Sequence, residues 1–97
     1  MSALFTPIKL RGLTLPNRIM VAPMCQYPAV NGEANDWHST HINTLPLSGA
    51  AMFCIEATAV EPRGRITPGC TGLWSDDHIP GLRRIVDFVH SQGAKAG

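Results

Sequence analysis

Cys25 and Tyr27 are the side chains in this sequence whose types and spacing best suit chemistry. They lie two positions apart, directly after an apolar run over residues 18–22 that Pro23 ends. A thiol is a weak hydrogen-bond donor, and a phenol both donates and accepts, so the pair could contact a polar ligand. Two plainer roles stay open: Cys25 as a small buried hydrophobic residue, and Tyr27 as an interfacial tyrosine with a solvated hydroxyl.

Histidines and the remaining cysteines offer weaker candidates. His38 and His41 lie three positions apart on an expected helix, but no cysteine or carboxylate partner is evident. We therefore predict capped or solvated histidines and no metal site. We predict that His78 and His90 lie on the surface, that Cys54 lies in the core, and that Cys70 is exposed with an ordinary pKa. Trp74 is predicted to be a packed aromatic residue. Glu56 is predicted to be a strand-end carboxylate whose partner lies outside this sequence.

Two apolar runs must position these side chains. Residues 18–22 and 51–55 show no polar alternation, which is typical of strands buried on both faces. Ahead of them, residues 8–15 alternate around Gly12 and predict a short hairpin.

A helix is predicted after each apolar run. The first begins at Asn35 or Asp36 and carries on roughly one side Trp37, His41, Ile42 and Leu45. The second follows a long loop over residues 61–72, begins at Asp76 or Asp77 and stops at Gly93, with an apolar stripe formed by Ile79, Leu82, Ile85, Val86 and Val89. Residues 95–97 then lead into a third strand.

The order of hairpin, strand, helix, strand, helix indicates an α/β fold with parallel strands and right-handed crossovers. A TIM (β/α)8 barrel typically takes about 250 residues. We therefore expect residues 1–97 to be the N-terminal portion of such a barrel domain, truncated after its second strand–helix unit. Active sites of these barrels lie at the C-terminal ends of the strands, which selects residues 22–27 and 56–60.

Composition excludes several functions. The 97 residues carry eight Lys and Arg against seven Asp and Glu, without a basic stripe, so nucleic-acid binding is not expected. No run approaches the roughly 18 apolar residues that span a bilayer, and the N-terminus lacks the pattern of a signal peptide. Three widely spaced cysteines fit a reducing, cytoplasmic setting.

Six short motifs together resemble the old yellow enzyme family, and Pro-Met-Cys-x-Tyr resembles its thermophilic-like subgroup, which includes bacterial xenobiotic reductases. The resemblance extends over nearly the whole chain. The motifs are Leu4-Phe5-Thr6-Pro7, Leu15-Pro16-Asn17-Arg18-Ile19, Ala22-Pro23-Met24-Cys25-Gln26-Tyr27, Glu56-Ala57-Thr58-Ala59-Val60, Gly64-Arg65-Ile66-Thr67 and Gly72-Leu73-Trp74-Ser75-Asp76.

The resemblance implies a homo-oligomeric ene-reductase in its full-length form. Such enzymes hold FMN without a covalent bond, take hydride from NADPH or NADH, and pass it to the C=C bond of an α,β-unsaturated carbonyl compound. By the same resemblance, backbone groups of Ala22, Pro23 and Met24 line the flavin, and Ala57 packs against it. Cys25 directs its thiol at the flavin and tunes its potential, and Tyr27 donates a hydrogen bond to the substrate.

The chain also departs from the family pattern. Apart from the helical spacing of His38 and His41, the chain has no counterpart of the family's substrate-anchoring His-x-x-His or His-x-x-Asn pair or of its phosphate loops, and Pro46 stands where a continuous helix is expected. Either that helix stops a turn early or this stretch is altered from a working enzyme. Two alternatives therefore remain open: a truncated fragment that is inactive and has no flavin of its own, and part of a related flavin barrel such as a dienoyl-CoA reductase.

Overall fold

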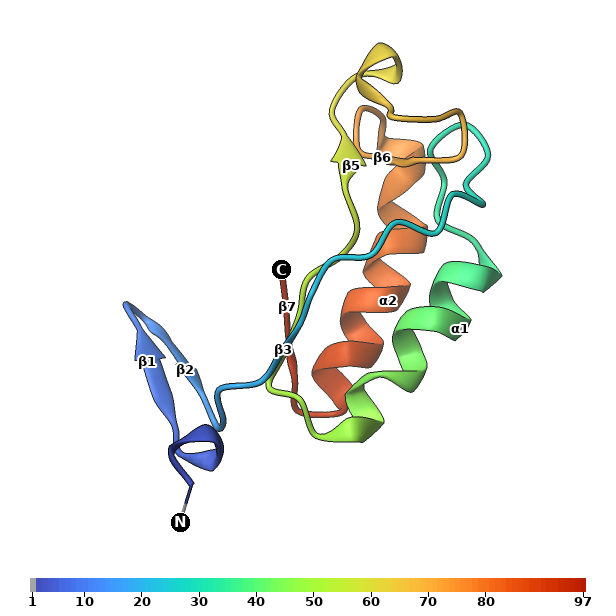
Figure 1. The fold of residues 1–97 in the computed structure, drawn as a ribbon. Helices are drawn as coiled ribbons and strands as arrows, with labels where there is room; N and C mark the ends of the chain where they lie inside the picture. Colours follow the sequence, from blue (N-terminus) through green and yellow to red (C-terminus); the bar gives the residue numbers. More distant parts are fainter. Residues whose placement is uncertain (1) are drawn as a thin grey trace.

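The N-terminal part of the chain is a hairpin set apart from the rest of the molecule (Figure 1). The computed structural model describes residues 2–97. A 3-10 turn, Ala3–Phe5, leads into strands β1 (Ile8–Leu10) and β2 (Leu13–Leu15). These pair antiparallel, with Ile8 opposite Leu15, and Arg11 takes a left-handed φ of 56° in the turn. The predicted hairpin is confirmed.

Three parallel strands form the central sheet. They are β3 (Met20–Val21), β4 (Met52–Phe53) and β7 (Lys95–Ala96), in the order β3-β4-β7. Both pairs are parallel, with Val21 opposite Phe53 and Phe53 opposite Ala96. The predicted parallel pairing and the third strand are therefore confirmed.

Helices α1 (Asp36–Thr44) and α2 (Ile79–Ser91) lie side by side over one face of this sheet (Figure 1). Buried side chains from both helices and from the sheet side form the core: Ile42, Ala50, Phe53, Ile85, Val89 and Ala94. This burial removes apolar surface from water, which is the main favourable term in folding. No helix within residues 2–97 is long and apolar enough to cross a membrane.

The opposite face of the sheet is open among the described residues. Val21 and Ala96 pack on the core, whereas Met20, one position before Val21, is 54% exposed. Alternate side chains of a strand point to opposite faces, so one row of each strand lacks a covering layer. The prediction of strands buried on both faces is therefore wrong for this chain taken by itself.

Helix α1 begins after Asn35, whose side chain accepts a hydrogen bond from the Trp37 N–H at 3.0 Å. His38 and Ile42 are buried, but Trp37 is 54% exposed. The inward face of α1 is formed by residues 38, 42 and 45. Trp37 lies about 100° away from His38 around the helix, so its predicted position on the inward face is wrong.

Pro46 lies just beyond the end of α1. The helix stops at Thr44, and Pro46 opens a 3-10 turn, Pro46–Ser48, that Gly49 ends with a left-handed φ of 88°. A proline has no N–H to donate, so it is tolerated at the first position of a new turn. The early stop, one of the two expected outcomes, is what the structure shows.

The segment between β4 and α2 is more ordered than the predicted loop. Strand β5 (Thr58–Ala59) pairs parallel with β6 (Thr71–Gly72), and 3-10 turns Pro62–Gly64 and Asp76–His78 lie on either side of β6. His78 is 2% exposed, and its ring contacts the Trp74 N–H at 3.2 Å and the Asn31 carbonyl at 2.8 Å. The predicted surface position of His78 is therefore wrong, whereas His90 is exposed as expected.

Candidate active site

The two predicted site segments meet at the C-terminal end of the parallel strands. The last bond between β3 and the segment after β4 joins the Cys54 N–H to the Val21 carbonyl at 3.2 Å. Beyond it, Ala22 and Met24 line the same small pocket as Ile55 and Glu56. The hairpin lies at the other end, where β3 begins (Figure 1). Parallel pairing thus places Cys25, Tyr27 and Ala57 at one end of the sheet.

The backbone that follows β3 has no partner in the sheet. No backbone–backbone hydrogen bond within residues 2–97 involves Ala22, Met24 or Cys25. Ala22, Pro23 and Met24 are exposed, and so is Ala57 on the neighbouring segment. Unpaired backbone groups need a partner, and at an exposed strand end they can bind water or a ligand.

Cys25 and Tyr27 act on each other directly. The pKa of the Tyr27 phenol is raised above its ordinary value of 10.0, chiefly by charge on and hydrogen bonding with the Cys25 thiol. Partial desolvation and the charges of Cys70 and Glu56 raise this pKa further. The structure thus brings the two predicted side chains together and places a second thiol and a carboxylate near them.

Tyr27 has an unusual backbone conformation that Gly69 accommodates. Its φ is 67°, in the left-handed region that non-glycine residues rarely occupy. A Cβ on Gly69 would lie 1.9 Å from the Tyr27 carbonyl oxygen. The Ala29 N–H also donates to the Gly69 carbonyl at 3.0 Å. The connection between β5 and β6 therefore packs directly against the Tyr27 backbone, and only glycine fits there.

Gln26 connects the site segment to α1. Its side-chain amide donates to the carbonyls of Met24 at 3.1 Å and of Cys25 at 3.4 Å. Its oxygen accepts a hydrogen bond from the Trp37 indole N–H at 3.0 Å. Gln26 was not predicted as a functional residue from the sequence.

His38 and Glu56 form a buried pair next to the site. His38 Nε2 lies 3.4 Å from Glu56 Oε1, with the two side chains 1% and 2% exposed. His38 Nδ1 accepts the Asn35 N–H at 3.1 Å, so the ring proton is on Nε2, facing the carboxylate. Glu56 thus has a buried neighbour within this sequence, while its pairing with a group outside residues 1–97 stays a prediction. His38 stands three positions after the cap Asn35, where a capping-box partner belongs, so the sequence could predict its bond to Asn35 but not its contact with Glu56.

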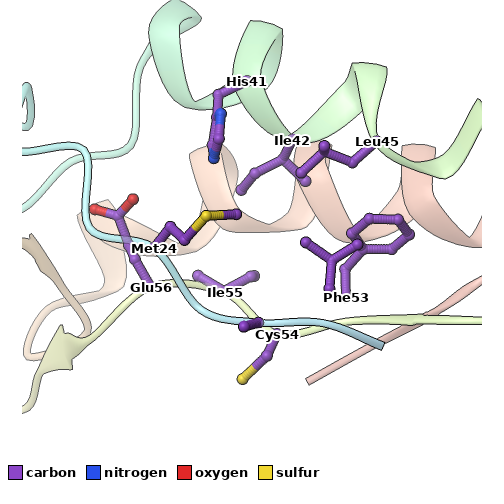
Figure 2. A pocket seen from close by; sticks show the side chains of 10 residues that line it. Met24, His41, Ile42, Leu45, Phe53, Cys54, Ile55 and Glu56 are labelled. Atoms are coloured by element: carbon purple, nitrogen blue, oxygen red, sulfur yellow. The ribbon is translucent and has the colours of Figure 1, made fainter. Parts of the chain in front are cut away.

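Figure 2 shows the pocket between α1 and the strands, with Met24 pointing toward Ile42 and the His41 ring directed inward. Its accessible space of about 10 Å³ holds no more than one water molecule. A flavin does not fit there, so this pocket is not the place where such a ligand binds. Met24 turns its side chain toward the helix and leaves its backbone for such a ligand.

The predicted exposure of Cys70 is wrong. It is 2% exposed, and the Thr67 N–H donates to its sulfur at 3.3 Å. This hydrogen bond lowers the pKa of the Cys70 thiol, although burial works in the opposite direction.

Cys54 is half-buried and does not belong to the fully buried core. Trp74 is half-buried and packs edge-on against His78, as expected for a packed aromatic residue. Within residues 2–97 no group of three potential metal ligands occurs.

Comparison with known proteins identifies the family. The profile of the NADH:flavin oxidoreductase / NADH oxidase family matches residues 3–97. This chain belongs to that family.

Three known proteins show how much of this chain, and how much of each relative, the similarity covers. The chain is 52% identical over 93 residues to NADH:flavin oxidoreductase FG08077 of Gibberella zeae, covering 96% of this chain and 22% of that protein. It is 46% identical over 99 residues to an NADPH dehydrogenase of Listeria welshimeri, covering 100% of this chain and 29% of that protein. A structure of morphinone reductase in complex with tetrahydroNAD superposes on this chain with a TM-score of 0.87 at 27% identity. The match covers 100% of this chain and 26% of the morphinone reductase chain.

The chain thus spans about a quarter of the length of these relatives. Its fold is that of the N-terminal portion of the old yellow enzyme TIM barrel, and the expected family and fold class are confirmed. The family is one of oxidoreductases that use flavin and NAD(P)H.

The residues at the strand ends fit one edge of a flavin ring. The backbone of residues 22–25, which has no partner in the sheet, offers donors and acceptors, Ala57 is small and exposed, and a thiol and a phenol lie beside them. A ring with alternating polar atoms needs such groups. The predicted site residues are therefore brought together, whereas sequence reasoning missed Gln26, Gly69 and the pairing of His38 with Glu56.

Proposed function

We propose that this chain supplies one side of an FMN site in an ene-reductase that takes hydride from NADPH or NADH and reduces the C=C bond of an α,β-unsaturated carbonyl compound. The observation that carries the proposal is that Cys25 and Tyr27 lie on backbone without a partner in the sheet, at the end of parallel strands. The family of flavin oxidoreductases supports the cofactor and the reaction class.

The proposed roles follow from what each group can donate or accept. Backbone groups of Ala22, Pro23 and Met24 bind the polar edge of the ring, and Ala57 allows its close approach. Cys25 offers a weak S–H donor to the ring, and Tyr27 orients the substrate with its hydroxyl. When bound, FMN supplies the transfer of hydride between the nicotinamide and the alkene.

A tyrosine phenol is protonated at neutral pH, and the raised pKa of Tyr27 extends this state to higher pH. A protonated phenol can donate a hydrogen bond to a carbonyl oxygen, and it thereby polarises the C=C bond conjugated with that carbonyl. The free thiols of Cys25, Cys54 and Cys70 fit the cytoplasmic location that we also propose.

Spectroscopy of the whole protein tests this function. We expect the purified protein to be yellow, with FMN released on denaturation, and to oxidise NADPH or NADH faster when an enone such as 2-cyclohexenone is added. A correctly folded protein that is colourless and takes up no added FMN would contradict the proposal.

A second candidate is a chain without a flavin of its own. The open edges of β3 and β7 and the exposed face carrying Met20 favour it, because unpaired strand edges promote self-association. Titration of the 97-residue chain with FMN separates the two: micromolar affinity excludes this candidate, whereas absence of binding supports it for the chain by itself.

A further inference from the structure

Two consecutive residues in the first turn of α1 reach the two strand ends that carry the proposed site. Trp37 donates its indole N–H to Gln26 of the segment after β3. His38 Nε2 lies 3.4 Å from Glu56 Oε1 in the segment after β4. Adjacent helical residues point about 100° apart, which allows one helical turn to contact two neighbouring segments.

We propose that this turn, the α1 clamp, positions the site, with Gln26 and Glu56 as positioning residues held by Trp37 and His38. The clamp consists of these four residues. That the two held segments form a flavin site rests on the proposed function above, but the clamp itself is a property of the chain.

The first arm of the clamp replaces hydrogen bonds that the sheet does not provide. Backbone bonds from the sheet are absent at Met24 and Cys25 within residues 2–97, and the Gln26 amide donates to both of their carbonyls. The Gln26 oxygen is in turn fixed by Trp37. Asn35, at the cap of the same helix, donates to the Pro28 carbonyl at 2.8 Å and holds the other side of Tyr27. The conformation around Cys25 thus depends on α1 more than on the sheet.

The second arm is the buried pair. Neither His38 Nε2 nor Glu56 Oε1 makes a hydrogen bond within residues 2–97, so the 3.4 Å ion-pair contact between them is the polar contact that the structure gives these two buried atoms. A carboxylate buried without a partner is costly, which makes the position of Glu56 sensitive to His38. Ala57 follows Glu56 directly, and Thr58 donates its hydroxyl to the Glu56 carbonyl at 2.8 Å. The pair therefore sets the start of the segment that carries Ala57 and β5.

A tryptophan substitution tests the first arm without flavin. Trp37→Phe keeps an aromatic ring and removes the N–H, and Trp74→Phe is the matched control, because the Trp74 indole makes no hydrogen bond within residues 2–97. One lost hydrogen bond corresponds to about a two- to tenfold change in the population of a released segment. We expect iodoacetamide to alkylate Cys25 faster by that factor in Trp37→Phe, followed by peptide mass spectrometry, with the rates at Cys54 unchanged.

Equal Cys25 rates in the wild type and Trp37→Phe would overturn this arm, as would equal increases in both tryptophan variants. Far-UV circular dichroism identifies a variant that unfolds as a whole. In that event Gln26→Glu, which still accepts from Trp37 but no longer donates to the two carbonyls, gives the same test with the same expected increase at Cys25.

Two substitutions of His38 test the second arm. The amide nitrogen of Gln reaches the place of Nε2, and the side-chain oxygen of Asn reaches the place of Nδ1. His38→Gln thus keeps the contact with Glu56 and loses the helix cap, whereas His38→Asn does the reverse. We expect hydrogen exchange at Thr58 and Ala59 to accelerate at least threefold in His38→Asn and to stay near the wild-type rate in His38→Gln. The opposite order would show a capping role only and would overturn this arm.

FMN affinity then separates the clamp from the function. If the whole protein binds FMN and Trp37→Phe binds it two- to tenfold more weakly, both ideas stand. If FMN binds equally to both, the clamp is wrong while the function stands. If neither binds FMN, the proposed function fails, and the alkylation and exchange rates still decide the clamp.

Discussion

At the scale of single residues, the contact between Cys25 and Tyr27 has a measurable consequence. Tyr27 is the one tyrosine of the chain, so absorbance at 295 nm reports its ionisation alone. We predict a midpoint above 10.0, because negative charge on Cys25 opposes formation of the phenolate.

Removing the thiol should reverse this shift. Cys25→Ala takes away the largest cause of the raised pKa, so its midpoint should be lower than that of the wild type, whereas Cys54→Ala should leave it unchanged. Circular dichroism at each pH confirms that the chain stays folded. A midpoint in Cys25→Ala that equals the wild-type midpoint would show that the two side chains do not meet.

At the scale of elements, the connection between β5 and β6 fixes the site through Gly69. Gly69→Ala would drive a Cβ into the Tyr27 carbonyl, and the backbone rather than a flexible side chain would have to move. We predict a loss of about 1–3 kcal/mol in the free energy of unfolding, measured in urea. The matched control is Gly12→Ala in the hairpin, which meets no atom within 4 Å. Equal stability of the two variants would be inconsistent with the described packing.

Elements of strong pattern could be predicted from the sequence. The stripe of α2, the hairpin around Gly12 and the parallel pairing of the two apolar runs all follow from spacing and from apolar content. Strand β6 could not be predicted in this way, since Thr71–Gly72 is too short for a period and its pairing with β5 is non-local.

The candidate site, too, could be predicted from the sequence only in part. The fold rule for barrels places residues 22–27 and 56–60 at strand ends, and this part was accessible from sequence. The links through Gln26 and His38, in contrast, depend on where α1 docks, which no local pattern encodes. The buried positions of Cys70 and His78 likewise come from tertiary packing of a segment whose composition is typical of an exposed loop.

At the scale of the whole molecule, the exposed sheet dominates the expected behaviour of the chain by itself. Strands β3 and β7 are both edges, and Met20 lies on the uncovered face. We predict concentration-dependent self-association in sedimentation velocity. Met20→Lys should weaken it, because a charged residue on an edge strand opposes pairing, whereas the control Val60→Lys, 77% exposed and outside the strands, should not. A monomer at all concentrations would refute this prediction.

The midpoint potential of FMN bound to the whole protein tests most directly whether the strand ends deliver Cys25 to the flavin. A hydroxyl is a stronger donor than a thiol and stabilises reduced flavin more. Cys25→Ser should therefore raise the potential by about 10–30 mV, the equivalent of one hydrogen bond in a two-electron couple, while Cys54→Ser leaves it unchanged. Equal potentials in the wild type and Cys25→Ser would contradict the proposed site.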